Sequence, residues 1–185
     1  MALLSMATYR SAAQSGALML YGSLNYHSNN QSGSGFSANP FGVGYFFNDH
    51  VVAGVNYAFD LEKNAAHQTT SYHHEAGLFY SDSYMLGDHF AIIGQADVHY
   101  VWGSAMNQEP GAYHYNGYLL RVYPLVAVLL GHGWALKAKF CELSFQQTKR
   151  NDAAHTTDQT FIAGVNGSTL GVGVSKNISF KKHRP

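Results

Sequence analysis

The feature that most constrains this chain is an alternation of large apolar residues with small or polar ones, sustained over segments of about ten residues. The clearest example is LGVGVSKNISF, residues 170–180, where every second residue from Leu170 is large and, apart from Lys176, apolar. The residues between them are Gly, Ser or Asn. A period of two is that of a β-strand, whose successive side chains point to opposite faces. This strand therefore has one bulky apolar face and one small polar face.

Similar segments recur along the chain, separated alternately by long polar stretches and by short turn sequences such as FNDH and GHG. We expect eight strands, at residues 17–27, 36–46, 51–61, 71–81, 90–103, 113–130, 134–145 and 160–180. The sixth is expected to bend or split at Pro124. No stretch sustains the apolar spacing of an amphipathic helix. The order of long and short connections predicts an antiparallel up-and-down meander, which an even number of strands can close into a barrel.

Strand length and composition indicate the environment of this barrel. Soluble strands usually have about 5–6 residues, whereas tilted strands that cross a bilayer need about 9–11. Only 12% of the residues are charged, against about 25% in typical soluble domains. We therefore predict an all-β, eight-stranded, antiparallel up-and-down transmembrane β-barrel over residues 16–180. Residues 1–15 are interpreted as a signal-peptide remnant or disordered N-terminus, and residues 181–185 as a basic C-terminal tail.

Charged residues in the middle of the strands predict the content of the lumen. A charge that faces lipid at mid-membrane costs several kcal/mol, so these side chains are expected to point inward and pair with one another. Eight strands leave an interior just wide enough for side chains. The predicted lumen network consists of Glu75, Asp97, Arg121, Lys137 and Lys139.

Aromatic residues concentrate near the ends of the expected strands, including Phe46, Tyr115 and Tyr123. Membrane barrels carry a ring of aromatic side chains, an aromatic girdle, at each bilayer interface. The residues assigned to such girdles are Tyr45, Tyr80, Tyr100, Trp102, Trp134 and Phe180.

At this point the chain resembles the small eight-stranded outer-membrane β-barrels of the OmpA/OmpX type, including the outer membrane protein beta-barrel domain family. The resemblance lies in FGVGYFFNDHVVAGVNYAF, LGDHFAIIGQADVHYVWGS, GHGWALKAKF and STLGVGVSKNISF. It implies a bacterial outer-membrane location, short periplasmic turns, longer extracellular loops and contact with the outer-membrane insertion machinery. Family members usually end in an aromatic residue, whereas here Phe180 is followed by KKHRP.

No motif in the chain predicts a catalytic, metal or cofactor site. His73 and His74 are adjacent, so on a strand they point to opposite faces and cannot chelate one ion together. Ser71 with His73 and Glu75, or His155 with its Thr and Asp neighbours, could form a hydrolase site on the rim, but such sets arise by chance in a chain rich in Ser and His. Equal numbers of acidic and basic residues, 11 each, exclude the basic face that nucleic-acid binding needs.

Three functional classes follow from these observations. The first is a monomeric structural or adhesion-type outer-membrane barrel with a plugged lumen, in contact with membrane lipids and lipopolysaccharide. The second is a small ion or solute channel. The third is a soluble ligand-binding barrel of the lipocalin type, which requires the large residues to face inward and charged residues to cover the outside.

Overall fold

The computed structural model describes residues 15–29, 33–64, 69–106, 112–151, 156–165 and 170–180. Within these ranges every regular element is a β-strand, and no helix is long and apolar enough to cross a membrane. Residues 1–14 and 181–185 lie outside the described part of the chain. The predicted signal-peptide remnant and basic tail therefore stay predictions.

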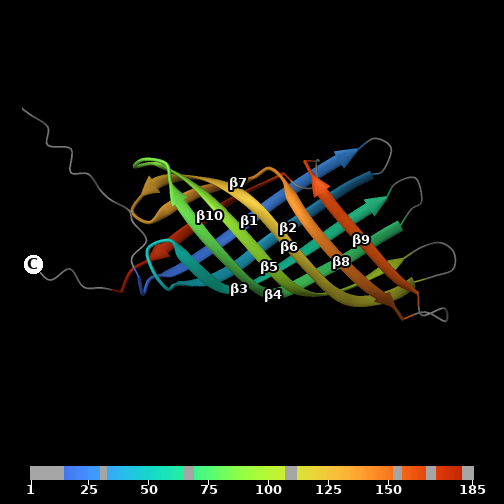
Figure 1. Cartoon of the computed structure of the whole chain (residues 1–185). Helices are drawn as coiled ribbons and strands as arrows, with labels where there is room; N and C mark the ends of the chain where they lie inside the picture. The colour runs from blue at the N-terminus through green and yellow to red at the C-terminus, as the bar shows by residue number, and fades with distance from the viewer. Residues whose placement is uncertain are drawn as a thin grey trace, which may run out of the picture.

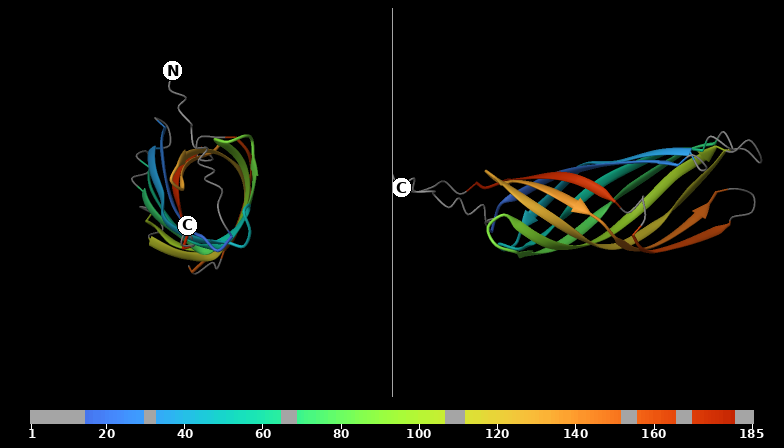
Figure 2. Two further views of the ribbon diagram at one scale, coloured as in Figure 1. Left: turned by 90° about the vertical axis from the view of Figure 1, so that its left-hand side faces the viewer. Right: turned by 90° about the horizontal axis from the view of Figure 1, so that it is seen from above.

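The strands form one antiparallel sheet that closes into a barrel (Figures 1 and 2). The segments are β1 (Leu18–Asn29), β2 (Gly33–Phe46), β3 (Val51–Asn64), β4 (Thr69–Met85), β5 (Phe90–Met106), β6 (Ala112–Gly131), β7 (Trp134–Lys139), β8 (Glu142–Arg150), β9 (Thr157–Gly164) and β10 (Gly171–Ile178). β7 and β8 are successive parts of one wall strand, and β9 and β10 of another, so ten segments occupy eight positions. Pairing of β1 with β10 closes the ring. The predicted eight-stranded up-and-down barrel is confirmed.

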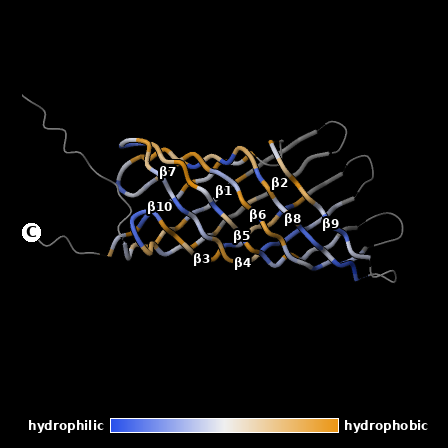
Figure 3. The backbone as a smooth tube through the Cα atoms, viewed as in Figure 1, coloured by the Kyte–Doolittle hydropathy of each residue, from blue (hydrophilic) through white to orange (hydrophobic). Residues whose placement is uncertain are grey.

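The alternation in the sequence becomes the two faces of the wall, visible as alternating colour along each strand in Figure 3. Large apolar residues point outward, as with Leu78, Val98 and Leu120, which are 63%, 57% and 45% exposed. Polar residues from the intervening positions, such as Gln95 and Asp97, are buried inside. The chain thus has the inverted polarity that the strand pattern predicts for a barrel in lipid.

The three short connections lie at one end of the barrel, on the left in Figure 1. In the first, at 47–50, the Asn48 side-chain oxygen accepts hydrogen bonds from the backbone N–H groups of His50 and Val51 at 3.0 and 2.7 Å. The last, Gly131 to Gly133, has positive φ at all three residues, and glycine meets this requirement at two of them. We call this end the turn end and the opposite one the loop end.

Several strands are longer than the sequence pattern predicts. β4 continues to Met85 and β5 to Met106, beyond the expected ends at residues 81 and 103. At the loop end only residues 30–32, 65–68, 107–111 and 151–156 separate the strands, so the long loops expected from the sequence are largely strand. Outside a lipid band the outer face can also be polar, so the alternation of polarity disappears although the strand continues.

Pro124 leaves β6 continuous and instead coincides with a break in its partner. The last β6–β7 pair joins Leu125 to Lys139, and the first β6–β8 pair joins Val122 to Leu143. Two residues of β6 therefore oppose three of the partner, which is the count of a β-bulge. Proline has no N–H to donate to a ladder. The predicted split of the sixth strand was wrong, because the neighbouring strand absorbs the irregularity at Phe140 and Cys141.

The wall is incompletely paired in its loop half. The last β1–β10 pair joins Leu24 to Val172, and among the described residues β1 positions 25–29 pair only with β2. β9 pairs only with β8 in the described part of the chain. The view from above in Figure 2 shows β9 and β1 well apart. We call the space between these two strand edges the seam.

Candidate functional site: a charged lumen

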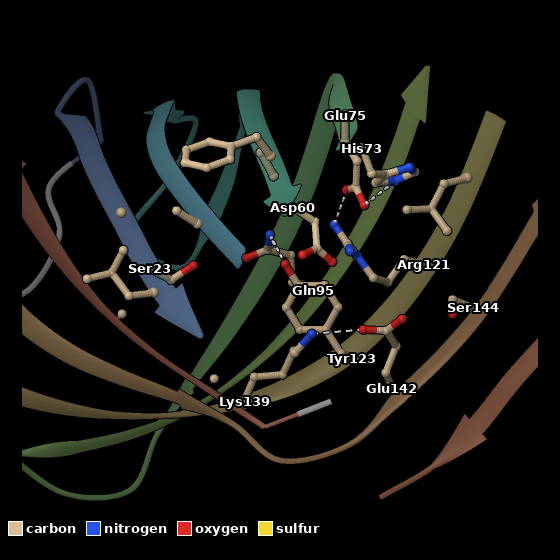
Figure 4. Close-up of a pocket in the computed structure, with 18 of the residues that line it drawn as sticks. Ser23, Asp60, His73, Glu75, Gln95, Arg121, Tyr123, Lys139, Glu142 and Ser144 are labelled. Carbon is tan, nitrogen blue, oxygen red and sulfur yellow. Dashed lines mark hydrogen bonds and ion pairs between the residues drawn. The ribbon is translucent and has the colours of Figure 1, made fainter. Parts of the chain in front are cut away.

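The middle of the lumen is organised around Arg121, which projects from β6 (Figure 4). Its guanidinium donates to the Glu75 carboxylate at 3.0 Å and to Asp97 Oδ2 at 3.2 and 3.3 Å. Asp97 faces Arg121 directly in the β5–β6 register. Glu75 and Asp97 are almost completely buried. One cation from β6 therefore pairs with carboxylates from β4 and β5.

The Glu75 carboxylate also collects two histidines that the sequence did not assign to the network. His99 Nδ1 lies 2.9 Å from Glu75 Oε2, and His73 Nε2 lies 3.2 Å from Glu75 Oε1. The second nitrogen of His99 contacts the Asn56 side-chain oxygen at 2.6 Å, and that of His73 contacts the Tyr115 hydroxyl at 2.9 Å. Hydrogen bonds thus run across the lumen from β3 to β6.

The Asp97 end of the network is closed by neutral side chains. Tyr123 donates to Asp97 at 3.0 Å, and the Gln95 amide donates to both Asp97 and the Tyr123 hydroxyl, at 2.9 and 2.6 Å. Tyr123, Phe46 and Tyr115 were expected among the terminal aromatic residues at the bilayer interface. Instead, Tyr123 and Phe46 are buried in the lumen, and Tyr115 contacts His73 there. Strand parity could have identified Tyr123, because it lies two residues from Arg121.

The two predicted lumen lysines lie inside but do not join the Arg121 cluster. Lys139 donates to Glu142 at 2.8 Å, across the bulge between β7 and β8. The Lys137 ammonium lies 3.3 Å from the Met19 sulfur and 5.7 Å from the centre of the Tyr21 ring. The structure thus brings Glu75, Asp97 and Arg121 together and leaves Lys137 and Lys139 beside them.

Below this network, towards the turn end, the lumen is filled by apolar side chains. One cluster comprises Ala17, Met19, Phe46, Val52 and Phe79, all at most 5% exposed. A second cluster comprises Ala91, Ile93, Tyr123, Leu125 and Ala127. We call these two clusters of packed interior side chains the apolar floor.

Above the floor the lumen is not full. A cavity of about 420 Å³ extends from Gln95 and Lys137 towards the loop end (Figure 4). Its walls include the small residues of β10 whose lack of bulk stands out in the sequence, Gly171 and Gly173. A Cβ added at Gly171 would meet only Lys139 Cε, at 4.0 Å. The lumen is therefore packed at the floor and hollow above it, and its closure to ions stays a prediction.

Comparison with known proteins supports the fold. The N-terminal β-barrel domain of Pseudomonas aeruginosa OprF matches 89% of this chain and 98% of its own length, with 11% identity and a TM-score of 0.55. The chain has the fold of a small outer-membrane β-barrel. A major outer membrane protein of Thermus thermophilus also matches (11% identity, 88% of this chain, 99% of that chain, TM-score 0.49). So does Ail, the attachment invasion locus protein of Yersinia pestis (10% identity, 88% of this chain, 97% of that chain, TM-score 0.41). No family model and no curated protein matches the sequence.

The aromatic residues assigned to girdles lie on the outside of this barrel in two groups. Tyr45, Tyr80, Trp134 and Phe180 lie towards the turn end and are exposed. Tyr100 and Trp102 lie towards the loop end, where their rings stack with a centroid distance of 5.9 Å. Their contact with lipid stays a prediction.

Among the described residues, the side chains considered for a catalytic or metal site do not assemble into one. His73 contacts Glu75, but its other nitrogen contacts Tyr115, and Ser71 lines the same cavity without a hydrogen bond to His73. His155 lies outside the described residues. In the described ranges no group of three or more His, Cys, Asp or Glu side chains could hold a metal ion.

Proposed function

We propose that this protein is an integral β-barrel of the bacterial outer membrane that does not conduct ions and serves a structural or adhesion role through its loop end. The observation that carries the proposal is the inverted polarity of the wall. Exposed apolar residues such as Leu78 and Val98 form the outer surface, while the Arg121 ion pairs are enclosed. A soluble lipocalin-type barrel requires the opposite arrangement, so that alternative loses its support.

The apolar floor supports a lumen closed at the turn end. Met19, Phe46 and Phe79 are almost completely buried there, and interiors packed in this way leave few voids larger than a water molecule. Among the described residues, such packing supports a lumen without a polar path for hydrated ions. Outer-membrane lipids, including lipopolysaccharide, would contact the exposed apolar face. The outer-membrane insertion machinery would fold the chain into the membrane, where it would be a monomer.

Planar-bilayer recording tests the closed lumen. We expect the purified, refolded protein to insert without steady single-channel openings. A matched variant, Phe79→Ser with Met19→Ser, removes bulk from the floor and is expected to produce openings. The polar cavity is the observation that supports the alternative function, a small channel. Steady openings of the wild type that disappear in Arg121→Ala or Glu75→Ala would establish a pore and overturn the closed lumen.

A further inference from the structure

The seam is bordered on both sides by apolar residues that point outward. On the β9 side Phe161 is 67% exposed, and at the last β1–β10 pair, which borders the seam, Leu24 and Val172 are 62% and 55% exposed. Exposed apolar residues of this kind mark wall that faces lipid. Strand edges without partners are tolerated at membrane depth only where protein or a water-filled cavity satisfies their backbone groups.

A cavity lies directly behind the seam. Its lining includes Ile162 of β9, on one side of the seam, and Ser23 and Leu24 of β1 with Gly171 and Val172 of β10, where the last β1–β10 pairs border the seam. Ile162 faces Ser144 in the β8–β9 register, and Ser144 is buried in the lumen. The seam thus connects the lipid-facing surface with the polar interior, and the cavity deepens from it towards the floor.

At the base of this cavity lies a cation, Lys137, for which no described residue provides a carboxylate partner. Lys137 lines the cavity, and its ammonium contacts the Met19 sulfur and the Tyr21 ring, which are weak partners for a charge. Glu75 and Asp97 are bound to Arg121, and Glu142 to Lys139. An ammonium whose nearest partners are a thioether and an aromatic ring gains from an anion placed beside it, so this position favours an anionic ligand.

The remaining charged groups around the cavity restrict where an anion can bind. Asp60 and His73 line it on the β3 and β4 walls, where they face each other in the strand register nearer the loop end. Asp60 repels an anion that enters along the barrel axis from the loops. An anionic headgroup that enters through the seam instead approaches Lys137 and Lys139 on β7, which neighbours β10.

We propose that the seam and the cavity behind it form a binding site for a single-chain anionic amphiphile. Its headgroup, a carboxylate or a phosphate monoester, lies at Lys137, and its hydrocarbon chain extends between β9 and β1 into the outer leaflet. The volume of about 420 Å³ accommodates a headgroup and the first part of one chain but not a two-chain lipid. The inference rests on the proposed membrane-spanning function, which gives the hydrocarbon chain its surroundings.

Photolabelling in phosphatidylcholine nanodiscs tests the site. The probe is a palmitate that carries a diazirine in its chain and an alkyne for detection, and peptide mass spectrometry locates the label. We expect the label on β9 and β1 beside the seam. Lys137→Met should lower the apparent affinity about tenfold, the loss expected for one charge-assisted hydrogen bond. Lys137→Arg should restore most of it.

Matched variants separate site occupancy from general effects. Gly171→Phe places a ring in the cavity and should abolish labelling, whereas Gly94→Phe adds the same ring outside, where nothing lies within 4 Å of a new Cβ. Lys176→Met removes a lysine from the turn end that lies over Trp134 at 5.0 Å, and it should leave labelling unchanged. Competition by palmitate or by palmitoyl lysophosphatidate identifies the preferred headgroup.

Three results would overturn the site. Label spread evenly over the outer surface and insensitive to Lys137→Met would indicate ordinary boundary lipid. Competition by hexadecanol as strong as that by palmitate would show that the headgroup is not recognised. Loss of labelling in Lys176→Met equal to that in Lys137→Met would indicate general attraction of anions. Failure of the wild type to show heat-modifiable gel mobility would instead contradict the membrane-spanning function itself.

Discussion

At the level of single residues, the lumen depends on Arg121, whose guanidinium is the shared donor to Glu75 and Asp97. Both carboxylates are largely buried, Asp97 almost completely, so loss of the guanidinium would leave two poorly solvated negative charges close together. Removing one member of a buried ion pair is costly mainly because the other charge stays behind. The arrangement therefore makes the network fragile to the loss of this one cation.

We predict that Arg121→Met lowers the free energy of unfolding by about 3–5 kcal/mol, measured by urea titration of the protein folded into lipid vesicles. Arg150→Met is the matched control. Arg150 pairs with Asp158 at 2.6 Å, but both side chains are more than a third exposed, and such pairs contribute about 1 kcal/mol or less. Equal destabilisation by the two substitutions would contradict the structural role of the Arg121 cluster.

Strand parity could predict that Glu75, Asp97 and Arg121 point inward, because a charge excluded from lipid has only one other side to occupy. It could not predict which residues would meet, since contacts across the lumen depend on the register of strands distant in sequence. His99 and Asn56 share a face with these charges, yet their contact of 2.6 Å joins β5 to β3. The need for glycine at position 42 also follows only from the fold, because a Cβ added there would lie 2.2 Å from Tyr21 Cε1.

At the level of elements, the bulge at Phe140 and Cys141 sets the orientation of β8. Before it, Leu136 and Phe140 point outward. After it, the exposed Leu143 and the buried Ser144 show that odd-numbered positions point outward instead. A shift of one residue moves every side chain of a strand to the opposite face. The extra residue is therefore required for Glu142 to meet Lys139 and for Ser144 to face the cavity.

Deletion of Cys141 should consequently prevent barrel formation, because it would direct Leu143 inward and Ser144 towards lipid. The expected result is loss of the heat-modifiable band on refolding into vesicles. Cys141→Ala keeps the residue count and should refold like the wild type. If the deletion variant refolded with native mobility, the bulge would not determine the register.

The strand pattern identified the elements where one face meets lipid and failed where that contrast ends. Segments such as 51–61 were located because their outer face is uniformly apolar, whereas the extension of β4 to Met85 was missed. The effect of Pro124 was assigned to the wrong strand, because a proline removes a donor from the ladder that β6 shares with its neighbour. The sequence alone does not show which strand accommodates that loss.

At the level of the whole molecule, the chain encloses its charged residues and exposes its apolar ones. The apolar floor lies at the turn end, a polar cavity lies above it, and among the described residues the seam interrupts strand pairing beside that cavity. The sequence predicted the inverted polarity, because it follows from alternation repeated in every strand. The seam could not be predicted, since it arises from the interruption between β9 and β10 within a segment that reads as one strand.

The membrane orientation of the outer surface is tested most directly by electron paramagnetic resonance of nitroxide labels. In a Cys141→Ala background, single labels at Leu78, Val98 and Leu120 report the surroundings of three mid-strand positions on the outer face. In lipid vesicles we predict frequent collisions with molecular oxygen and rare collisions with a water-soluble nickel chelate at all three sites. Frequent collisions with the nickel chelate at these sites would place the outer face in water and contradict the account.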